Sequence, residues 1–163
     1  MAFSLLPTLK YNKLTDVSPP DLTERGIRLL ILDLDNTVSP YKMNEPTPEV
    51  TAWRESMEGA GITLFIVSNN HGERPRIFSE KLKIPYIKRA KKPFTRGIYA
   101  AMEAVGAAKS ETALAGDQIY TDMLAANFAG ITGILVEPIK FSNPLLAVRY
   151  FFELPFRHIK KER

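Results

Sequence analysis

Five short apolar segments stand out along the chain, separated by longer polar stretches. The segments at residues 26–34 and 62–67 are continuous runs rich in branched side chains, without the alternation of a half-exposed strand. Such runs are typical of strands that are buried on both faces of a sheet. Strands are therefore predicted at residues 26–34, 62–67, 86–88, 112–115 and 131–136.

Helical patterns lie between these strands. Thr47-Pro48-Glu49 is a typical helix start, with a capping hydroxyl, a proline and an acid, and Gly59 or Gly61 ends that helix. Further helices are predicted at about 74–82, 93–105 and 117–128. Because strands and helices alternate, we expect right-handed crossovers and an α/β fold: a doubly wound parallel sheet of about five strands with helices on both faces.

The composition is that of one globular domain. The chain has 163 residues, of which 45% are hydrophobic and 25% charged, so we expect one domain over residues 1–163 with its core at about 26–138. The pattern leaves the structure of residues 1–25 open. The absence of cysteine excludes disulfides and thiolate metal sites and fits a cytoplasmic location. No apolar run approaches the roughly 20 residues that span a bilayer, and residues 1–10 do not resemble a signal peptide.

The C-terminal segment, residues 141–163, is basic and aromatic. Residues 140–163 contain six basic and two acidic side chains, an excess equal to the net charge of +4 of the whole chain. Such a segment suits a helix that lies on an anionic membrane, with Pro155 breaking it near its end. A helix packed on the sheet with a solvated basic end fits the same pattern. Nucleic acid is the weaker option, because the chain shows no recognition module.

Polar residues collect where the predicted strands end. Ligands bind at the carboxyl ends of the strands in open parallel sheets. Four strand ends thus offer three carboxylates, one hydroxyl, one amide and one ammonium to a single crevice, and these residues are Asp33, Asp35, Ser68, Asn69, Lys92 and Asp117.

This set of side chains suits phosphoryl transfer. A carboxylate such as Asp33 can attack phosphorus and form an aspartyl-phosphate, and a second carboxyl can protonate the leaving oxygen. Clustered carboxylates need a hard cation, for which Mg²⁺ is suited. Ser68, Lys92 and backbone amides can stabilise the negative phosphoryl oxygens.

The same residues resemble four motifs of the haloacid dehalogenase superfamily. The run from Asp33 to Thr37 resembles the first motif, and Val67-Ser68-Asn69 resembles the second. Lys91-Lys92-Pro93 resembles the third, with Lys92 the better match, and the run from Gly116 to Asp122 resembles the fourth. The four occur in order, which makes the set much more specific than any one motif.

The resemblance implies a role for each residue. Asp33 would be the nucleophile and a metal ligand, and Asp35 the general acid and base, with its backbone carbonyl on the metal. Lys92 would neutralise charge around Asp33 and the phosphoryl group. The second acid favours a phosphatase over a dehalogenase or an ion pump. The remaining roles are phosphate binding by Thr37, Ser68 and Asn69, direct Mg²⁺ binding by Asp117, and indirect support of the metal by Asp122.

Short intervals around the motifs leave no room for a cap domain. Nine residues separate Thr37 from Thr47, and twenty-three separate Ser68 from Lys92. The chain therefore resembles the short, capless members of the superfamily, which include phosphatases of phosphatidylglycerophosphate and bacterial relatives. An open crevice suits a large substrate or one displayed on a surface, here a phospholipid head group at the inner face of the membrane.

A second hypothesis belongs to a different class. The chain would then be a vestigial member of the superfamily that binds RNA, the ribosome or a protein partner. The sequence also leaves open the oligomeric state and whether Tyr41, Lys42 or His71 contacts substrate.

Overall fold

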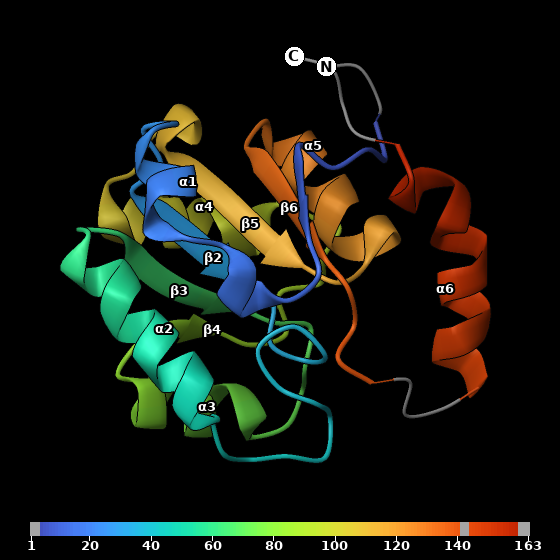
Figure 1. Ribbon diagram of the computed structural model, residues 1–163, viewed down its shortest axis with the longest axis horizontal. Coiled ribbons are helices and arrows are strands. Elements are labelled where there is room, and N and C mark those ends of the chain that lie inside the picture. The colour runs from blue at the N-terminus through green and yellow to red at the C-terminus, as the bar shows by residue number, and fades with distance from the viewer. Residues whose placement is uncertain (1–3, 141–143, 160–163) are drawn as a thin grey trace.

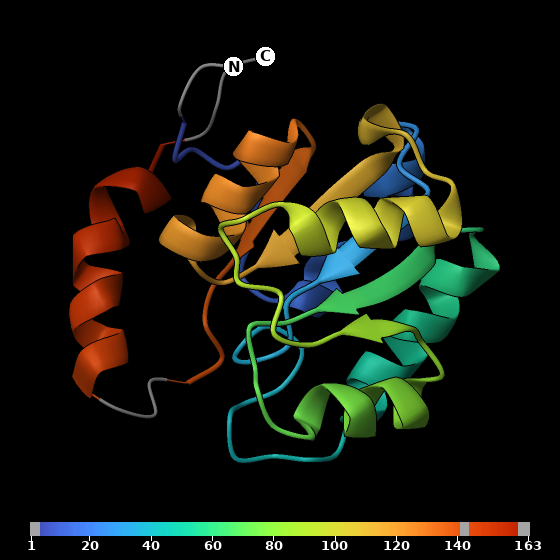
Figure 2. The same cartoon turned by 180° about the vertical axis from the view of Figure 1, so that it is seen from behind.

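The fold is a six-stranded parallel sheet with helices on both faces (Figures 1 and 2). The structure is a computed structural model that describes residues 4–140 and 144–159. The strand order is β1-β6-β5-β2-β3-β4, which confirms the predicted doubly wound α/β class. The strands are β1 (Leu9–Tyr11), β2 (Leu29–Leu32), β3 (Thr63–Val67), β4 (Tyr86–Ile87), β5 (Thr112–Gly116) and β6 (Thr132–Val136).

The sheet has one strand more than the five predicted. The extra strand, β1, comes from the N-terminal segment whose structure the sequence pattern left open. Leu9 and Tyr11 pair in parallel with Ile134 and Val136 of β6. Because β1 has three residues, all half-buried at the edge of the sheet, it lacks the long apolar run that marks the inner strands.

The helices match the predicted ones closely in two cases and differ in two others. α2 and α3 lie where the pattern placed them. α4 begins three residues later than predicted, because residues 93–95 form a turn in which the Phe94 N–H donates to the Lys91 carbonyl. The predicted helix at 117–128 is divided into a π-helical turn and a short α-helix. The helical elements are η1 (Leu14–Asp16), α1 (Pro19–Thr23), α2 (Pro48–Gly59), α3 (Arg74–Leu82), α4 (Arg96–Val105), η2 (Lys109–Glu111), η3 (Ile119–Met123), α5 (Leu124–Ala129) and α6 (Pro144–Arg157).

β2 lies at the centre of the sheet and is buried on both sides. Leu30 and Leu32 belong to the core cluster under α1, α2 and α3, whereas Leu29 and Ile31 belong to the cluster under α4 and α5. All four side chains are almost fully buried. The two helical layers thus explain why this segment is continuously apolar, and they fix the direction in which the chain leaves the sheet at residue 33.

α6 stands beside the sheet and contacts the chain after β5 (Figure 1). Glu153 and Arg157 are buried in this contact, while Leu145, Phe151 and Phe152 are exposed. The prediction that Pro155 breaks the helix is wrong: the helix continues through it to Arg157, whose buried contacts hold the last turn. The basic end at 160–163 and residues 141–143 lie outside the described residues. No helix within 4–140 and 144–159 is long and apolar enough to cross a membrane.

The two apolar surfaces can be compared with matched leucine substitutions. We expect Leu30→Ala to lower the free energy of unfolding by about 2–5 kcal/mol, because it leaves a cavity in the central strand. Leu145→Ala, on the exposed face of α6, should change it by less than about 0.5 kcal/mol. Urea denaturation measures both. A similar cost for the two would show that the exposed face of α6 is buried in solution.

Candidate active site

Asp33 follows directly on β2 and is fixed by the sheet. Its backbone N–H donates to the Ala115 carbonyl of β5 over 2.9 Å. The chain then turns sharply at Asn36, which has a left-handed φ of 64°. This turn returns Thr37 to the strand end, where its hydroxyl oxygen lies 3.4 Å from Asp33 Oδ2 and 3.3 Å from Asp117 Oδ1. Thr37 is therefore placed beside both Asp33 and Asp117.

Lys92 binds two carboxylates with one ammonium group. Its Nζ lies 2.7 Å from Asp33 Oδ1 and 2.7 Å from Asp122 Oδ1, and all three side chains are buried. The backbone of Lys92 is held by the Asn69 side chain, which accepts from the Lys92 N–H (2.7 Å) and donates to the Lys92 carbonyl (3.0 Å). The Asn69 side chain therefore positions Lys92. The phosphate contact predicted for Asn69 stays a prediction.

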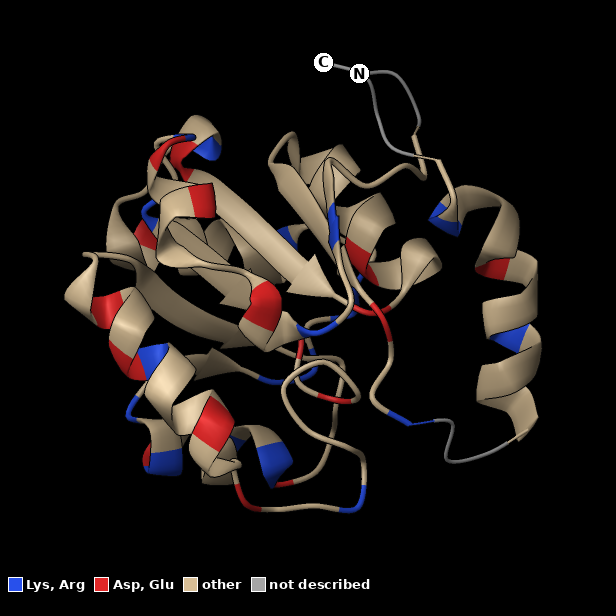
Figure 3. Ribbon diagram, viewed as in Figure 1, with Lys and Arg blue, Asp and Glu red and all other residues tan. Residues whose placement is uncertain are grey.

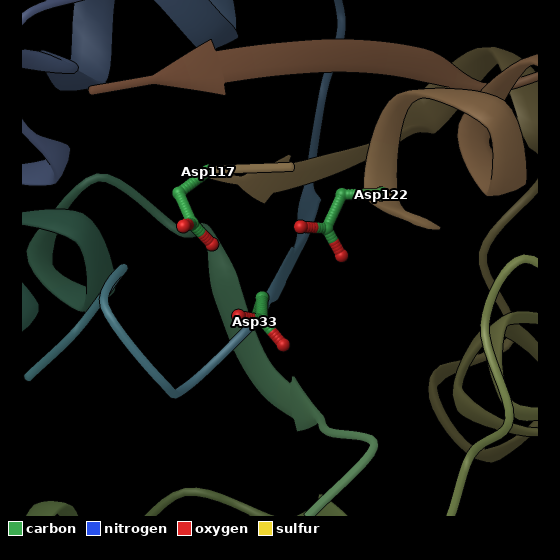
Figure 4. A group of neighbouring side chains, drawn as sticks. All are labelled: Asp33, Asp117 and Asp122. Carbon is green, nitrogen blue, oxygen red and sulfur yellow. The ribbon is translucent and has the colours of Figure 1, made fainter. Parts of the chain in front are cut away.

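Asp33, Asp117 and Asp122 form a cluster of three buried carboxylates (Figure 4). Each offers one oxygen, and these oxygens lie within 4.8 Å of one another. Asp122 comes close because position 116 is glycine: a Cβ there would lie 2.3 Å from the Asp122 carboxyl carbon. An all-oxygen, acid-rich donor set fits a hard divalent cation. Asp35 was predicted to bind the metal through its backbone carbonyl, which stays a prediction, and its side chain lies outside this cluster.

Burial and mutual repulsion disfavour ionisation of the cluster. Burial raises the pKa of Asp33 to about 7, with Lys92 opposing the rise and Asp122 adding to it. Burial, followed by the charges of Asp33 and Asp122, likewise raises the pKa of Asp117. Burial alone would lower the pKa of Lys92, but Asp122 and Asp33 outweigh it and the pKa is raised. One ammonium therefore stabilises three acids only in part, which favours a further cation.

Asp35 is held by two residues that the sequence motifs did not indicate. Arg74 Nε donates to Asp35 Oδ1 over 2.9 Å, and Asn70 Nδ2 donates to Asp35 Oδ2 over 2.8 Å. Asn70 is itself fixed, because its backbone N–H donates to Ser68 Oγ over 3.1 Å. Arg74 begins α3, so the start of this helix reaches across to the end of β2. Arg74 and Asn70 lie far from Asp35 in the sequence, so no local sequence pattern indicates these contacts.

An open cavity of about 310 Å³ lies over these groups. Its lining contains residues from all four motif runs, together with residues that were not predicted as site residues. Tyr41 and His71, left open by the sequence, both line it, and Lys42 does not. The predicted lining residues are Asp33, Asp35, Ser68, Asn69 and Lys92. The additional ones are Asn70, Gln118 and Thr121.

No cap domain lies in the two intervals where one was excluded. Both intervals fall within the described part of the chain. Residues 38–47 form a loop that leads into α2, and residues 69–91 contain only α3, β4 and their connections. The cavity over Asp33 is therefore not covered by a separate domain of these segments.

α6 is bonded directly to the segment that carries Asp117. Arg157 Nη2 donates to the Asp117 carbonyl, and Glu153 Oε1 accepts from the Ile119 N–H over 3.1 Å. Arg157 and Glu153 also pair with each other over 3.1 Å. In the sequence these two residues look like ordinary charges on the surface of a helix. The structure shows that they fix the backbone next to two acids of the cluster.

Comparison with known proteins identifies the family. The family model described as mitochondrial PGP phosphatase matches residues 3–140, most of the chain. The chain belongs to this family. "Probable phosphatase YqeG" of Bacillus subtilis is 36% identical over 138 residues, which cover 85% of the chain and 80% of that protein. With this family membership, the protein is a phosphatase of the haloacid dehalogenase superfamily.

Solved structures show the same fold. The cobalt-bound deoxy-D-mannose-octulosonate 8-phosphate phosphatase of Haemophilus influenzae is 18% identical, covers 69% of each chain and superposes with a TM-score of 0.57. The 3-deoxy-D-manno-octulosonate 8-phosphate phosphatase of Moraxella catarrhalis, in complex with magnesium, phosphate and KDO, is 19% identical. It covers 68% of this chain and 70% of its own, with a TM-score of 0.53. At these identities, the likeness concerns the fold.

The raised pKa of Asp33 has a consequence for stability. The folded protein holds the Asp33 proton more tightly than the unfolded chain does, since the pKa rises from 3.8 to about 7. The free energy of unfolding of the metal-free protein should therefore fall as the pH rises from about 4 to 7. Asp33→Asn should flatten this dependence. Denaturation in chelator at several pH values measures it, and equal slopes for the two proteins would contradict the assignment.

Proposed function

We propose that the protein is a Mg²⁺-dependent phosphomonoester hydrolase that works through an aspartyl-phosphate on Asp33, and that residues 1–163 act as one phosphatase domain. The observation that carries this proposal is the buried contact of Lys92 with both Asp33 and Asp122, within reach of Asp117. This arrangement holds a carboxylate at the floor of an open cavity, next to a fixed positive charge. The vestigial alternative is not favoured, because every group that the chemistry requires is present.

The reaction would proceed in two balanced steps. An oxygen of Asp33 attacks phosphorus, the bond from phosphorus to the ester oxygen breaks, and Asp35 gives that oxygen a proton. Water then attacks the phosphorus of the aspartyl-phosphate and Asp35 takes a proton from this water, while the bond from phosphorus to the Asp33 oxygen breaks, which releases phosphate and restores the Asp33 carboxylate. For these transfers Asp35 faces the cavity while Arg74 and Asn70 hold its carboxyl group.

Several residues would stabilise the phosphoryl group during these steps. Lys92 contributes a positive charge that its two carboxylate partners keep in place. Ser68 lines the cavity and offers its hydroxyl to a phosphoryl oxygen. Thr37 contacts Asp33 and Asp117 and so orients the acids. Tyr41 stays a neutral donor, because burial raises its pKa to about 12.

Asp33, Asp117 and Asp122 would hold the metal ion, with the backbone carbonyl of Asp35. When bound, Mg²⁺ supplies positive charge that offsets the repulsion among the acids and the charge of the phosphoryl oxygens. The carboxylate of Asp122 belongs to the cluster, which supports a more direct role in metal binding than the indirect support that the motif resemblance implied.

The family description suggests phosphatidylglycerophosphate as the substrate. Two features of the structure support a lipid: the cavity over Asp33 is open, and α6 exposes Leu145, Val148, Phe151 and Phe152. Few charged positions interrupt the ribbon of α6 (Figure 3). We propose that α6 rests on the cytoplasmic surface of the membrane and brings the active site to the lipid.

The nucleophile can be tested with a soluble aryl phosphate in Mg²⁺. Asp33→Asn should lower kcat by at least about 1,000-fold, because an amide cannot form the acyl-phosphate. Asp16→Asn, an exposed acid in η1, is the matched control and should stay within about twofold of the original rate. Activity that survives Asp33→Asn would refute the covalent mechanism.

The metal site can be tested without turnover. Mg²⁺ at 100 times its dissociation constant should stabilise the protein by about 2.7 kcal/mol, seen as a rise in the midpoint of thermal unfolding. Asp117→Asn should abolish this rise. The metal-free variant should be at least as stable as the original protein, because a buried acid with a raised pKa is replaced by a neutral group. Asp16→Asn should retain the full Mg²⁺ effect; loss of the effect in both variants would point to unfolding instead.

The role of α6 can be tested by sedimentation with phosphatidylglycerol vesicles. Phe151→Ser with Phe152→Ser should weaken vesicle binding by about tenfold or more, because each exposed ring contributes apolar area to the membrane contact. Hydrolysis of the aryl phosphate should be unchanged. Truncation at residue 140 is unsuitable, since it would also remove the contacts of Glu153 and Arg157 with the Asp117 segment. Unchanged vesicle binding would exclude α6 as the membrane contact.

A further inference from the structure

A second cavity lies beside the active site and has a different character. It has a volume of about 510 Å³ and lies between β4 and the start of α4. Lys92 lines the active-site cavity, and its neighbour Lys91 lines the second one. The chain between β4 and α4 runs along the carboxyl ends of the strands (Figure 2). Consecutive residues of the chain thus line the two cavities.

The rim of the second cavity is strongly basic. The run from Tyr86 to Arg96 contains five cations and no acid. Lys92 turns inward to Asp33, and the other four line this cavity: Lys88, Arg89, Lys91 and Arg96. Lys88 pairs with Glu73. Arg89, Lys91 and Arg96 are exposed and form no ion pair with any residue in 4–140 or 144–159, so their charges are available to a ligand.

The backbone holds these charges in place. The Arg89 N–H donates to the Asn70 carbonyl over 3.2 Å, and the Ala90 N–H donates to the Ser68 carbonyl over 3.0 Å. Arg89 and Lys91 both have left-handed backbones, with φ of 55° and 56°. Ala90 and Lys92 between and after them are buried. Exposed and buried side chains therefore alternate along residues 89–92. Ala90 and Lys92 point inward, and the unpaired cations Arg89 and Lys91 point outward.

The floor of the cavity is apolar. Ile87, Ala90, Gly97 and Ala100 line it, and the Phe94 ring beside it is 72% exposed. A cationic rim over an apolar floor is complementary to an anion that carries a hydrocarbon group. A single-stranded nucleic acid would instead need a longer basic track with several stacking rings. The part of this cavity within the described residues offers one such ring.

We propose that this cavity binds the phosphodiester and the adjoining acyl-glycerol part of an anionic phospholipid. The inference rests on the proposed function in one respect: phosphatidylglycerophosphate carries both a terminal phosphomonoester and an internal phosphodiester. The monoester would lie over Asp33 while Arg89, Lys91 and Arg96 bind the diester. Recognition of a lipid would then come from charges next to the catalytic lysine.

The kinetic test uses a short-chain, water-soluble phosphatidylglycerophosphate, which removes any contribution of the membrane surface. The variant Arg89→Gln, Lys91→Gln, Arg96→Gln should lower kcat/KM for this lipid at least tenfold, chiefly through KM. Its kcat/KM for an aryl phosphate, which has no second phosphate, should stay within twofold. The control variant is Arg25→Gln, Lys83→Gln, Lys109→Gln. It removes three charges from exposed positions that come before β2, β4 and β5 in the chain. This control should leave both values unchanged.

A binding test separates the site from the reaction. Short-chain phosphatidylglycerol has the diester but no monoester, and its binding to the Asp33→Asn protein can be followed by calorimetry. We expect at least tenfold weaker binding in the triple variant. Phe94→Ala should weaken binding of the lipid and leave that of glycerophosphoglycerol, which lacks acyl chains, unchanged.

The outcomes distinguish the inference from the proposed function. Binding of phosphatidylglycerol that depends on the three cations, without hydrolysis of phosphatidylglycerophosphate, would support the lipid site and refute the proposed substrate. Hydrolysis of the short-chain lipid that is unaffected in the triple variant would refute the site and leave the function intact. Equal loss with inorganic phosphate as the probe would also overturn the inference, because it would show a general anion site.

Discussion

The site depends on one ammonium group shared by two carboxylates. Lys92 holds Asp33 at the end of β2 and Asp122 in η3, both at 2.7 Å, where all three side chains are buried. Desolvation of such a group is costly unless its partners are close and fixed. Asn69 fixes its backbone, Gly116 leaves space for Asp122, and the parallel sheet brings all these segments to one edge. The arrangement remains short of positive charge, which is the physical reason for proposing a metal ion there.

The sequence was sufficient for the inner fold and for the location of the site. The strands β2, β3, β5 and β6 are buried on both faces apart from the first residues of β3 and β6, so their sequences are almost entirely apolar and recognisable. Parallel strands present their carboxyl ends on one side, and the polar residue after each therefore falls in the same place. The sequence alone therefore places Asp33, Ser68, Lys92 and Asp117 at one edge of the sheet.

Features that depend on packing between distant segments could not be predicted. β1 is a half-buried edge strand with only three residues. Arg74 and Asn70 reach Asp35 because the turn after β3 and the start of α3 lie beside the end of β2, and nothing in the motif itself encodes that placement. Pro155 was expected to end α6, since its missing N–H weakens a helix. The tertiary contacts of Arg157 outweigh this local preference.

The bonds from Glu153 and Arg157 to the Asp117 segment make α6 part of the ligand-binding apparatus in a thermodynamic sense. Two binding events that act on one structural element are linked, and the linkage is reciprocal. Under the proposed function, a surface that favours the docked position of α6 would strengthen cation binding by the three acids, and cation binding would favour the docked helix by the same free energy. A phosphatase built in this way would be most fully assembled where the membrane and the metal ion are present together.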